Sequence, residues 1–225
     1  MRVAASVVAR RLRALGFRAV AVSVDGTHLR LRFRHRVAGS RVVAAMRPGL
    51  LAIYDFEPAV NGPFRSRPTA AHVLTCSSHE VVCPGKGLGG SIEPPKPGTT
   101  YYYVATSAPR LTNRDLKAKL TRSDFDPATG EPVVLFEFNA QGSIKFRRLT
   151  AAEFRRGRLR REPQHFAIAL DGEIRAFPQI DYTKSDLSGG ISANAELSGL
   201  GSRRDAELLA VTLSEPLPVG FVRVR

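Results

Sequence analysis

The first 15 residues carry apolar side chains at the spacing of an α-helix. The positions that lie three or four residues apart are Val3, Val7, Val8, Leu12 and Leu15. Gly16 follows where the C-terminus of a helix is commonly capped. The pattern predicts an amphipathic helix whose outer face is rich in arginine.

Two stretches of alternating apolar and polar residues follow, Ala19–Val24 and Leu29–Arg34, separated by Asp25-Gly26. Because Asp-Gly tolerates the positive φ angles of a tight turn, the pattern predicts a β-hairpin. Its second strand would direct leucine and phenylalanine to one face and arginine to the other.

A short helical stretch near Arg41–Met46 ends at Pro48-Gly49, and Leu50–Phe56 has the pattern of a strand. The order helix, hairpin, helix, strand predicts an α+β fold with a ferredoxin-like layer. Such a layer normally opens with a strand before its first helix. We therefore expect the chain to be cut at its start.

The segment 61–100 is dense in Gly, Pro, Ser and Thr and has no sustained periodicity. We predict a long inserted loop there. Strand character resumes at Tyr101–Ala105.

The remainder of the chain predicts further strands and helices. The strand candidates are Pro132–Phe138, His165–Leu170 and Glu173–Phe177, the last two joined by a turn at Asp171-Gly172. The helix candidates are Ser143–Leu149, a second helix through Arg156 that begins at a Thr150/Glu153 capping box, and a last helix from Ser202 toward Ser214. A terminal strand that pairs with the N-terminal sheet is predicted at Phe221, Val222 and Val224.

The chain is strongly basic, with 34 Lys and Arg against 20 Asp and Glu, a formal net charge of +14. Such a charge predicts attraction to nucleic acid, anionic lipid or acidic polypeptide. The densest basic patch comprises Arg147, Arg148, Arg155, Arg156, Arg158, Arg160 and Arg161. Arginines at this density on a helix usually form a solvated face, and no recognisable nucleic-acid-binding motif accompanies them. A soluble basic nucleic-acid-binding α+β protein is therefore the alternative function.

No window holds the roughly 18 consecutive apolar residues that a membrane-spanning helix needs. Arg10, Arg11 and Arg13 interrupt the N-terminal apolar stretch before a signal-peptide core could form. We expect the chain as given to be soluble and without an export signal.

Four potential metal ligands are spaced H-x3-C-x2-H-x3-C, namely His72, Cys76, His79 and Cys83. They could in principle surround zinc, but no helix or knuckle scaffold is evident around them. These are the only two cysteines, and they lie in a loop that lacks its own core and would gain from a covalent link. We favour a Cys76–Cys83 disulfide in an oxidising compartment over a zinc site or two free thiols.

Acidic residues occur in near pairs, which are Asp55 with Glu57, Asp124 with Asp126 and Asp171 with Glu173. Residues two apart in a strand or turn tend to face solvent on either side of one buried side chain. No nucleophile accompanied by histidine and carboxylate, and no phosphate-binding glycine loop after a strand, is recognisable. We predict no enzymatic activity, no cofactor and no metal.

Three stretches carry recognisable motifs in a fixed order. GEPVVLFEFNAQGSIKFRRLT (Gly130 to Thr150) has an acidic strand, a glycine, a helix with phenylalanine and then a threonine. QHFAIALDGEIRAFPQIDYT (Gln164 to Thr183) has a buried strand that turns at Asp-Gly and returns toward a proline. LSGLGSRRDAELLAVTLSEPLPVGF (Leu197 to Phe221) has an N-capped helix and a Leu-Pro-Val exit. Together they resemble the SecD family, although Ser214-Glu215-Pro216 replaces the glycine-containing link usual before Leu217.

The resemblance implies an extracytoplasmic domain of a protein-export subunit in the cell membrane, with a ferredoxin-like base and an inserted or following α+β head that moves relative to it. We place the base at residues 1–107, including the cysteine-containing loop 61–100, the head at 108–214 and a return strand at 215–225. The implied partners are an unfolded preprotein and, through membrane parts that this chain lacks, a SecF-like subunit and the Sec channel.

A surface that contacts many unrelated unfolded chains needs exposed backbone edges and adaptable apolar side chains. Four phenylalanines cluster in the predicted head, Phe136, Phe138, Phe146 and Phe154. They are candidates either for the lining of a polypeptide-binding groove or for the core. The arginines of the basic patch are candidates for contact with acidic substrate segments or an anionic membrane surface.

Overall fold

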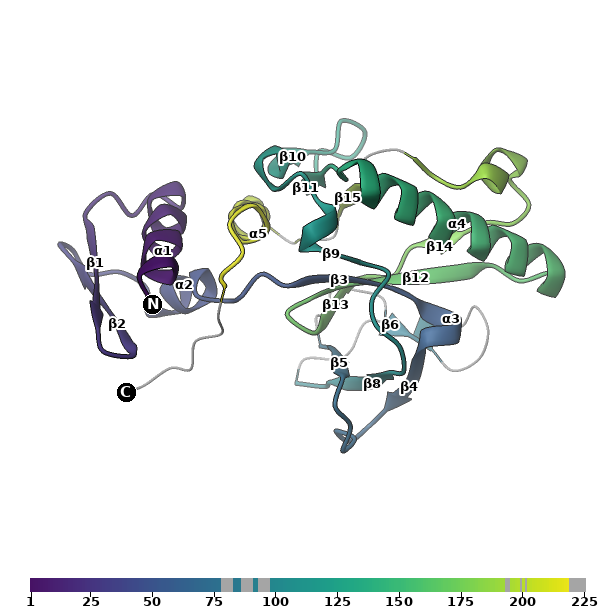
Figure 1. Cartoon of the computed structure of the whole chain (residues 1–225), viewed down its shortest axis with the longest axis horizontal. Coiled ribbons are helices and arrows are strands. Elements are labelled where there is room, and N and C mark those ends of the chain that lie inside the picture. The colour runs from purple at the N-terminus through teal and green to yellow at the C-terminus, as the bar shows by residue number, and fades with distance from the viewer. Residues whose placement is uncertain are drawn as a thin grey trace.

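The computed structural model describes residues 1–77, 83–85, 91–92, 98–192, 195–198, 200 and 202–218. It has a mixed α/β fold with two unequal parts (Figure 1). We call residues 1–48 the N-terminal module and residues 49–217 the large module. Helix α5 (Arg203–Ser214) belongs to the large module and lies between the two parts. Within the described ranges, no helix combines the length and the apolar character needed to cross a bilayer.

The N-terminal module packs a helix against a two-stranded antiparallel hairpin. Its elements are α1 (Arg2–Ala14), β1 (Val20–Asp25), β2 (His28–Phe33) and α2 (Gly39–Ala45). The predicted hairpin is confirmed, since Asp25 pairs with His28 and Gly26 has the positive φ of +57° that the turn requires. Its leucines and phenylalanine pack against the core of the module, while its arginines are exposed.

Helix α1 lies within one residue of its predicted bounds and exposes Arg2, Arg10 and Arg13, but one arginine departs from the predicted outer face. Arg11 is 0% exposed and lies among the buried residues of the helix. It follows Val7 by four positions and Val8 by three, so it occupies the apolar stripe rather than the arginine-rich face. The prediction was therefore wrong for this arginine.

One mixed sheet of eight strands forms the centre of the large module. Its strands are β3 (Leu51–Asp55), β4 (Val60–Phe64), β5 (Val73–Cys76), β8 (Tyr101–Ala105), β9 (Leu111–Thr112), β12 (Gln164–Leu170), β13 (Glu173–Ala176) and β14 (Gln179–Ile180). They run in the order β4-β8-β5-β13-β12-β3-β9, with β14 paired to β12. Because β12 and β13 lie between β5 and β3, the boundary placed at residue 107 falls inside this sheet.

The segment 61–100, for which a loop was predicted, contributes strands β4 and β5 to the sheet. The sequence did not indicate β4 because it contains Gly62 and Pro63, which normally weaken a strand. At the edge of a sheet a proline is tolerated, since its missing N–H faces away from the ladder. The four residues of β5 are too short to show a period. Two further short strands are β6 (Cys83–Pro84) and β7 (Ser91–Ile92).

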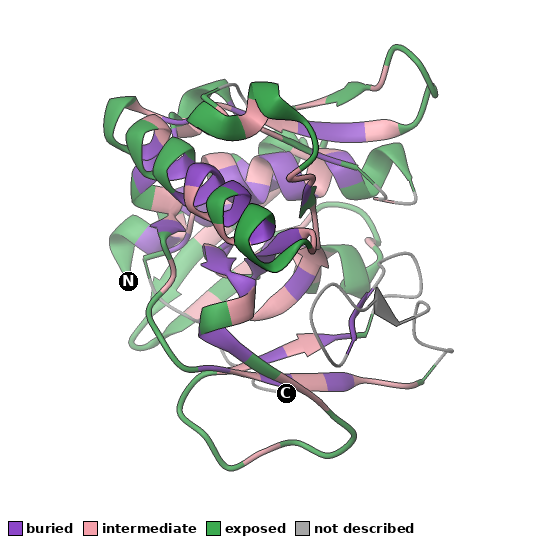
Figure 2. Cartoon of the chain, turned by 90° about the vertical axis from the view of Figure 1, so that its right-hand side faces the viewer, coloured by how far each residue is buried: buried purple, intermediate pink, exposed green. Residues whose placement is uncertain are grey.

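Two hydrophobic cores lie against the sheet. One lies beneath helix α4 (Ala140–Arg160), a small sheet and α5, and it includes Leu51, Ile53 and Ile168. The other lies in the curled lobe formed by β4, β5 and β8, closed by the short helix α3 (Phe56–Ala59). All seven residues of β12 are buried, because both cores use this strand. Figure 2 shows the buried stripes of the helices turned inward and their exposed faces turned out.

The small sheet consists of β10 (Arg122–Phe125), β11 (Pro132–Phe136) and β15 (Ala195–Leu197), in that order. Three 3-10 turns complete the module, η1 (Asn113–Asp115), η2 (Ala118–Leu120) and η3 (Ser185–Gly189). Helix α5 begins after its N-cap Ser202 and ends at Ser214, which confirms the prediction. The terminal strand predicted at Phe221, Val222 and Val224 lies outside the described residues.

Helix α4 is one continuous helix of 21 residues, although two helices were predicted in this region. Its N-cap is Asn139, whose side chain accepts a hydrogen bond from the Gly142 N–H. Thr150 does not cap a helix, since its hydroxyl donates to the Phe146 carbonyl one turn earlier at 3.0 Å. The Thr/Glu spacing that suggests a capping box is therefore also compatible with the middle of a helix.

Candidate polypeptide-binding surface

The four phenylalanines predicted as candidate groove residues are buried, with exposed fractions of 0% for Phe136 and 3% for Phe138, Phe146 and Phe154. The Phe138 ring lies 5.7 Å from that of Phe136 and 4.8 Å from that of Phe146, between centroids. In this conformation they are core residues beneath α4, so an extended polypeptide could not contact them. Of the two roles considered for them, the structure supports packing.

The most accessible apolar surface of the small sheet lies instead around β10. Phe125 is 47% exposed, and Leu120, in the turn before the strand, is 43% exposed. The Arg203 guanidinium lies 5.7 Å from the centre of the Phe125 ring. We call Leu120, Arg122, Ser123, Asp124 and Phe125 the β10 surface.

Strand β10 pairs with β11 on one side, and no other described strand pairs with it. The Asp126 N–H donates to the Glu131 carbonyl at 2.9 Å, which makes Asp126 and Glu131 a hydrogen-bonded pair. Since such pairs alternate along an antiparallel ladder, the backbone groups of Ser123 and Phe125 point to the open edge. The outward N–H of Phe125 donates to its neighbour's carboxylate, Asp124 Oδ1, at 2.9 Å. The N–H and C=O of Ser123 and the C=O of Phe125 thus remain for an added strand.

The two edges of the eight-stranded sheet are less suited to strand addition. Strand β4 contains Pro63 and a register shift between Asn61 and Phe64. Strand β9 has two residues only. An edge strand that is interrupted or very short makes a poor template for pairing.

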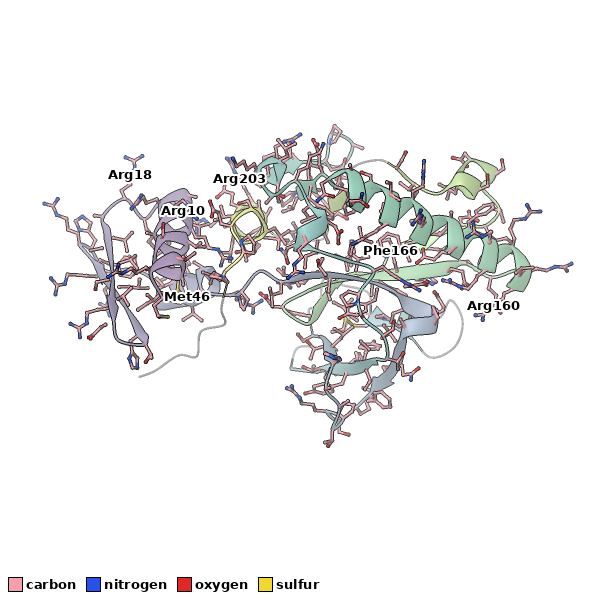
Figure 3. All side chains as sticks on the ribbon, viewed as in Figure 1. Arg10, Arg18, Met46, Arg160, Phe166 and Arg203 are labelled. Carbon is pink, nitrogen blue, oxygen red and sulfur yellow. A yellow bond between two sulfur atoms is a disulfide. The ribbon has the colours of Figure 1, made fainter. Side chains whose placement is uncertain are left out.

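Six of the seven arginines in the predicted basic patch are exposed, all but Arg156. Arg156 is only 24% exposed and binds Asp55 through two N–H groups, one of them at 3.1 Å, while its Nε donates to Gln164 at 3.2 Å. The structure therefore removes Arg156 from the patch. The remaining arginines follow the outer face and the C-terminal end of α4, where Figure 3 shows Arg160 directed away from the body.

Arg156 belongs to a buried polar cluster that the sequence did not indicate. Glu57 accepts hydrogen bonds from the backbone N–H of His165 at 2.9 Å and from its ring Nδ1 at 2.8 Å. The His165 ring also stacks on Phe177, with 4.5 Å between centroids. Asp55 and Glu57, which were expected to face solvent, are 4% and 6% exposed. That expectation was wrong because Asp55 ends the central strand β3 and Glu57 lies in α3, the short helix that closes the curled lobe of β4, β5 and β8.

Glu153 projects from α4 into the same cluster and is 0% exposed. Neither of its carboxylate oxygens has a hydrogen-bond partner among the described residues. Burial, with smaller contributions from the charges of Asp55 and Glu57, raises the pKa of Glu153 to about 9. Glu153 is therefore neutral at pH 7.

The joint between the two modules is built around Arg11. Its five N–H donors are directed at five backbone carbonyls, at 2.5 to 3.0 Å, which are those of Ala45, Arg47, Pro48, Thr212 and Glu215. The first three lie at the end of α2 and in the connection to β3, and the last two at the C-terminal end of α5. Burial lowers the pKa of Arg11 to about 10, so it remains charged at pH 7. Gly49, with φ of +77°, leaves no room for a Cβ beside Thr212.

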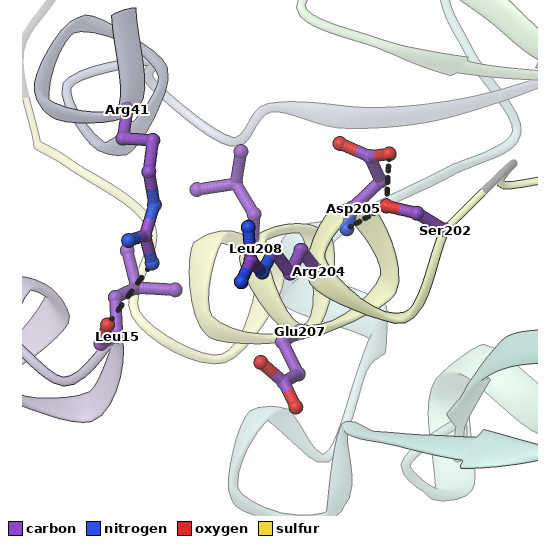
Figure 4. A pocket seen from close by; sticks show the side chains of 7 residues that line it. All are labelled: Leu15, Arg41, Ser202, Arg204, Asp205, Glu207 and Leu208. Atoms are coloured by element: carbon purple, nitrogen blue, oxygen red, sulfur yellow. Dashed lines mark hydrogen bonds between the residues drawn. The ribbon is translucent and has the colours of Figure 1, made fainter. Parts of the chain in front are cut away.

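A cavity of about 230 Å³ lies next to this joint, between the N-terminal module and α5 (Figure 4). Leu15 and Arg41 line it from the N-terminal module, and α5 contributes Arg204, Asp205, Glu207 and Leu208. Arg10, next to Arg11 in the chain, pairs with Glu215 at 2.7 Å. Beside this cavity the two modules also meet through apolar side chains, since Leu208 of α5 and Leu217 pack in the core of the N-terminal module.

Cys76 and Cys83, the pair for which a disulfide was predicted, are bonded in the structure and are 0% exposed. They lie in the core of the curled lobe, where the Tyr103 hydroxyl donates to the Pro84 carbonyl at 2.6 Å. Sulfurs joined in a disulfide are not thiolate ligands, so the alternative zinc set loses two of its four members. His79 lies outside the described residues.

Comparison with known proteins shows which family this chain resembles. The family described as the SecDF P1 head subdomain matches residues 92–219. Protein translocase subunit SecD of Acidaminococcus fermentans is 36% identical over 110 residues, which cover 48% of this chain and 22% of that protein. The subunit of the same name from Thermobaculum terrenum is 34% identical over 103 residues, covering 44% and 17% respectively. The chain thus spans about a fifth of the length of these curated relatives.

Two solved structures share the fold at lower identity. One, described as the crystal structure of SecDF in a super-membrane-facing form, has a TM-score of 0.57 at 22% identity and covers 97% of this chain and 26% of that chain. The other, described as a structure of SecDF, a membrane component that enhances protein export, has a TM-score of 0.57 at 21% identity and covers 100% and 91%. The chain belongs to the SecDF P1 head family and is a periplasmic P1 domain of the SecD type.

Proposed function

We propose that this chain is the extracytoplasmic part of a SecD-like export subunit, which binds translocating unfolded polypeptide and moves relative to its N-terminal module. The family match supports a place in protein export. The observation that carries polypeptide binding is the β10 surface, where unpaired backbone groups adjoin exposed Phe125 and Leu120. A peptide added as a strand is held mainly through its backbone, so many sequences can bind.

We place the boundary between the two moving parts at the joint around Arg11. A boundary at residue 107 would separate neighbouring strands of one sheet. At the joint, by contrast, two short segments connect the modules, 46–50 and 214–217, and a cavity lies beside the apolar contact that Leu208 and Leu217 make with the N-terminal core. The proposed base is therefore the N-terminal module, and the proposed head is the large module.

Photo-crosslinking tests the binding surface directly. A photo-crosslinking residue in place of Phe125 should join the chain to reduced, carboxymethylated lactalbumin, which is permanently unfolded. Phe64, 40% exposed at the edge of β4, is the matched control for exposure, and Phe154 is the control for the core. Equal crosslinking at Phe125 and Phe64 would contradict a specific surface at β10.

Binding by strand addition also requires the outward backbone N–H of Ser123, which can be tested separately. Ser123→Pro removes an outward N–H while leaving the hydrogen bonds between β10 and β11 in place, and Ser123→Ala keeps the N–H. We expect only the proline variant to lower the affinity for the unfolded polypeptide, by roughly fivefold or more, since a backbone hydrogen bond contributes about 1 kcal/mol. The same affinity in both variants would mean that side chains alone bind the polypeptide.

A further inference from the structure

The positive charge of the chain is concentrated in its smaller part. Residues 1–48 contain eleven arginines and a single acidic residue, Asp25, a formal net charge of +10. The other 177 residues carry 23 basic and 19 acidic residues, a net charge of +4. The N-terminal module, rather than α4, therefore dominates the attraction of this chain to polyanions.

The outer face of the hairpin collects part of this charge along one strand. Arg30, Arg32 and Arg34 alternate along β2 and its continuation, so their side chains share one face, and all three are exposed. Their cross-strand neighbours on β1 and before it are small, because Ser23 pairs with Arg30 and Ala21 with Arg32. We call Arg30, Arg32 and Arg34 the hairpin arginines.

These arginines are only partly neutralised by the protein itself. Arg30 forms an ion pair with Asp25 at 2.8 Å. Within the described residues, Arg32 and Arg34 make no ion pair. Arg18, at the entry to the hairpin, is also exposed and projects away from the module in Figure 3. Nothing on this face competes strongly with an external anion for Arg32 and Arg34.

We propose that the outer face of the hairpin docks on an anionic phospholipid surface through the hairpin arginines. Phe17 and Phe33 pack against the core of the module, so the aromatic ring that shares this face with Arg30 and Arg32 is the imidazole of exposed His28. One imidazole offers little of the stacking surface that nucleic-acid bases use. The Cys76–Cys83 disulfide indicates an oxidising compartment, where phospholipid headgroups are an abundant polyanion. Docking would hold the N-terminal module while leaving the β10 surface of the large module free, and it does not depend on polypeptide binding.

Vesicle cosedimentation of the full chain tests this proposal. The probes are vesicles of phosphatidylcholine alone and of equal parts phosphatidylcholine and phosphatidylglycerol, at low and at physiological salt. We expect binding only to the anionic vesicles, weakening as salt is added. Substituting Arg30, Arg32 and Arg34 together by alanine should lower the partition coefficient by roughly a hundredfold, because each arginine near an anionic surface contributes about a fivefold factor.

The matched control removes three exposed arginines from α4, Arg155, Arg158 and Arg160, and so changes the net charge equally. It should lower binding by less than about threefold, since those residues lie on the large module. Replacing the hairpin arginines by lysine should preserve binding, and Asp25→Asn should strengthen it. Circular dichroism of each variant verifies that the hairpin module still folds.

Three results would overturn the proposal. The first is unchanged vesicle binding after removal of the hairpin arginines. The second is an equal loss in the α4 control, which would show that net charge alone drives association. The third is a hairpin variant that loses binding to a single-stranded oligonucleotide but keeps its binding to anionic vesicles, which would assign the face to nucleic acid.

Discussion

Helices α1 and α4 each place one charged residue on a buried face, and the two modules accommodate that residue in opposite ways. Arg11 of α1 keeps its charge, because five backbone carbonyls accept its five N–H groups. Glu153 of α4 is neutralised instead, because neither carboxylate oxygen has a partner among the described residues and two more carboxylates lie near. A buried charge is retained where its hydrogen bonds are complete and is lost to protonation where they are not.

The comparison also separates two structural tasks. Arg11 joins elements that are distant in sequence, the α2–β3 connection and the end of α5, so it holds the two modules together. Glu153 lies within one module, beside a cluster that already pairs Asp55 with Arg156 and Glu57 with His165. Loss of the first should therefore affect the joint, whereas loss of the second should affect how stability depends on pH.

The largest effect is expected at Arg11. Arg11→Met keeps an apolar side chain of similar length but removes five hydrogen bonds, of which those to Ala45 and Thr212 are buried. It should lower the free energy of unfolding by about 3–5 kcal/mol. Urea denaturation measures this change. Arg13→Met, on the exposed face of the same helix, is the control and should change stability by less than about 0.5 kcal/mol. Similar values for the two variants would show that the Arg11 network does not stabilise the joint.

Glu153→Gln should stabilise the protein, by an amount that depends on pH. The pKa of Glu153 is raised from 4.5 to about 9 in the folded protein. The folded state therefore binds a proton that the unfolded state releases above pH 4.5, and wild-type stability falls as the pH rises between these values. Relative to wild type, the variant should gain about 3 kcal/mol at pH 7 and less than about 0.5 kcal/mol at pH 4.5.

Chemical denaturation at a series of pH values measures the effect of Glu153→Gln. Exposed Glu131 of the same module provides the control, Glu131→Gln, which should show no such slope. A constant difference between wild type and Glu153→Gln across this pH range would mean that the carboxylate is ionised in the folded protein. The contrast with Arg11 would then disappear.

The disulfide constrains the large module and has no equivalent in the N-terminal module. Replacing Cys76 and Cys83 by serine removes a link across a sequence separation of seven residues and should cost about 2–3 kcal/mol. Thermal unfolding with and without a reducing agent measures this loss. Amide hydrogen exchange should become faster in the curled lobe around Tyr103 and stay unchanged in the hairpin of the N-terminal module.

The smallest effect is expected at the ion pair beside Arg11. Arg10 and Glu215 are 49% and 34% exposed, so solvent screens their attraction. Glu215→Gln should lower stability by about 0.5 kcal/mol at pH 7. The hydrogen bond from Arg10 lowers the pKa of Glu215, so this contribution is present above its unfolded pKa and is lost as the pH falls through the folded value. A loss as large as that for Arg11→Met would show that exposure does not distinguish the two neighbouring arginines.

Local patterns were sufficient for elements that depend on neighbouring residues. The hairpin at Asp25-Gly26, the turn at Asp171-Gly172 and the helix after Ser202 all formed as predicted, because turn residues and caps act within a few positions. The same local reasoning divided α4 at Thr150 and missed β4, since neither position reveals what packs against it. The candidate groove of four phenylalanines became core, and the exposed apolar residue proved to be Phe125.

By itself, the sequence determined the periodicities, the turns, the excess of positive charge and the resemblance to SecD. The spacing of Arg11 and Glu153 from apolar neighbours was also present in the sequence, but local patterns assigned the one to an arginine-rich outer face and the other to a capping box. Only the tertiary structure decided whether each of these side chains keeps its charge. Whether a buried charge meets five carbonyls or two other carboxylates depends on segments as far as 204 residues away, because solvation and hydrogen bonding are set by what surrounds a side chain in space.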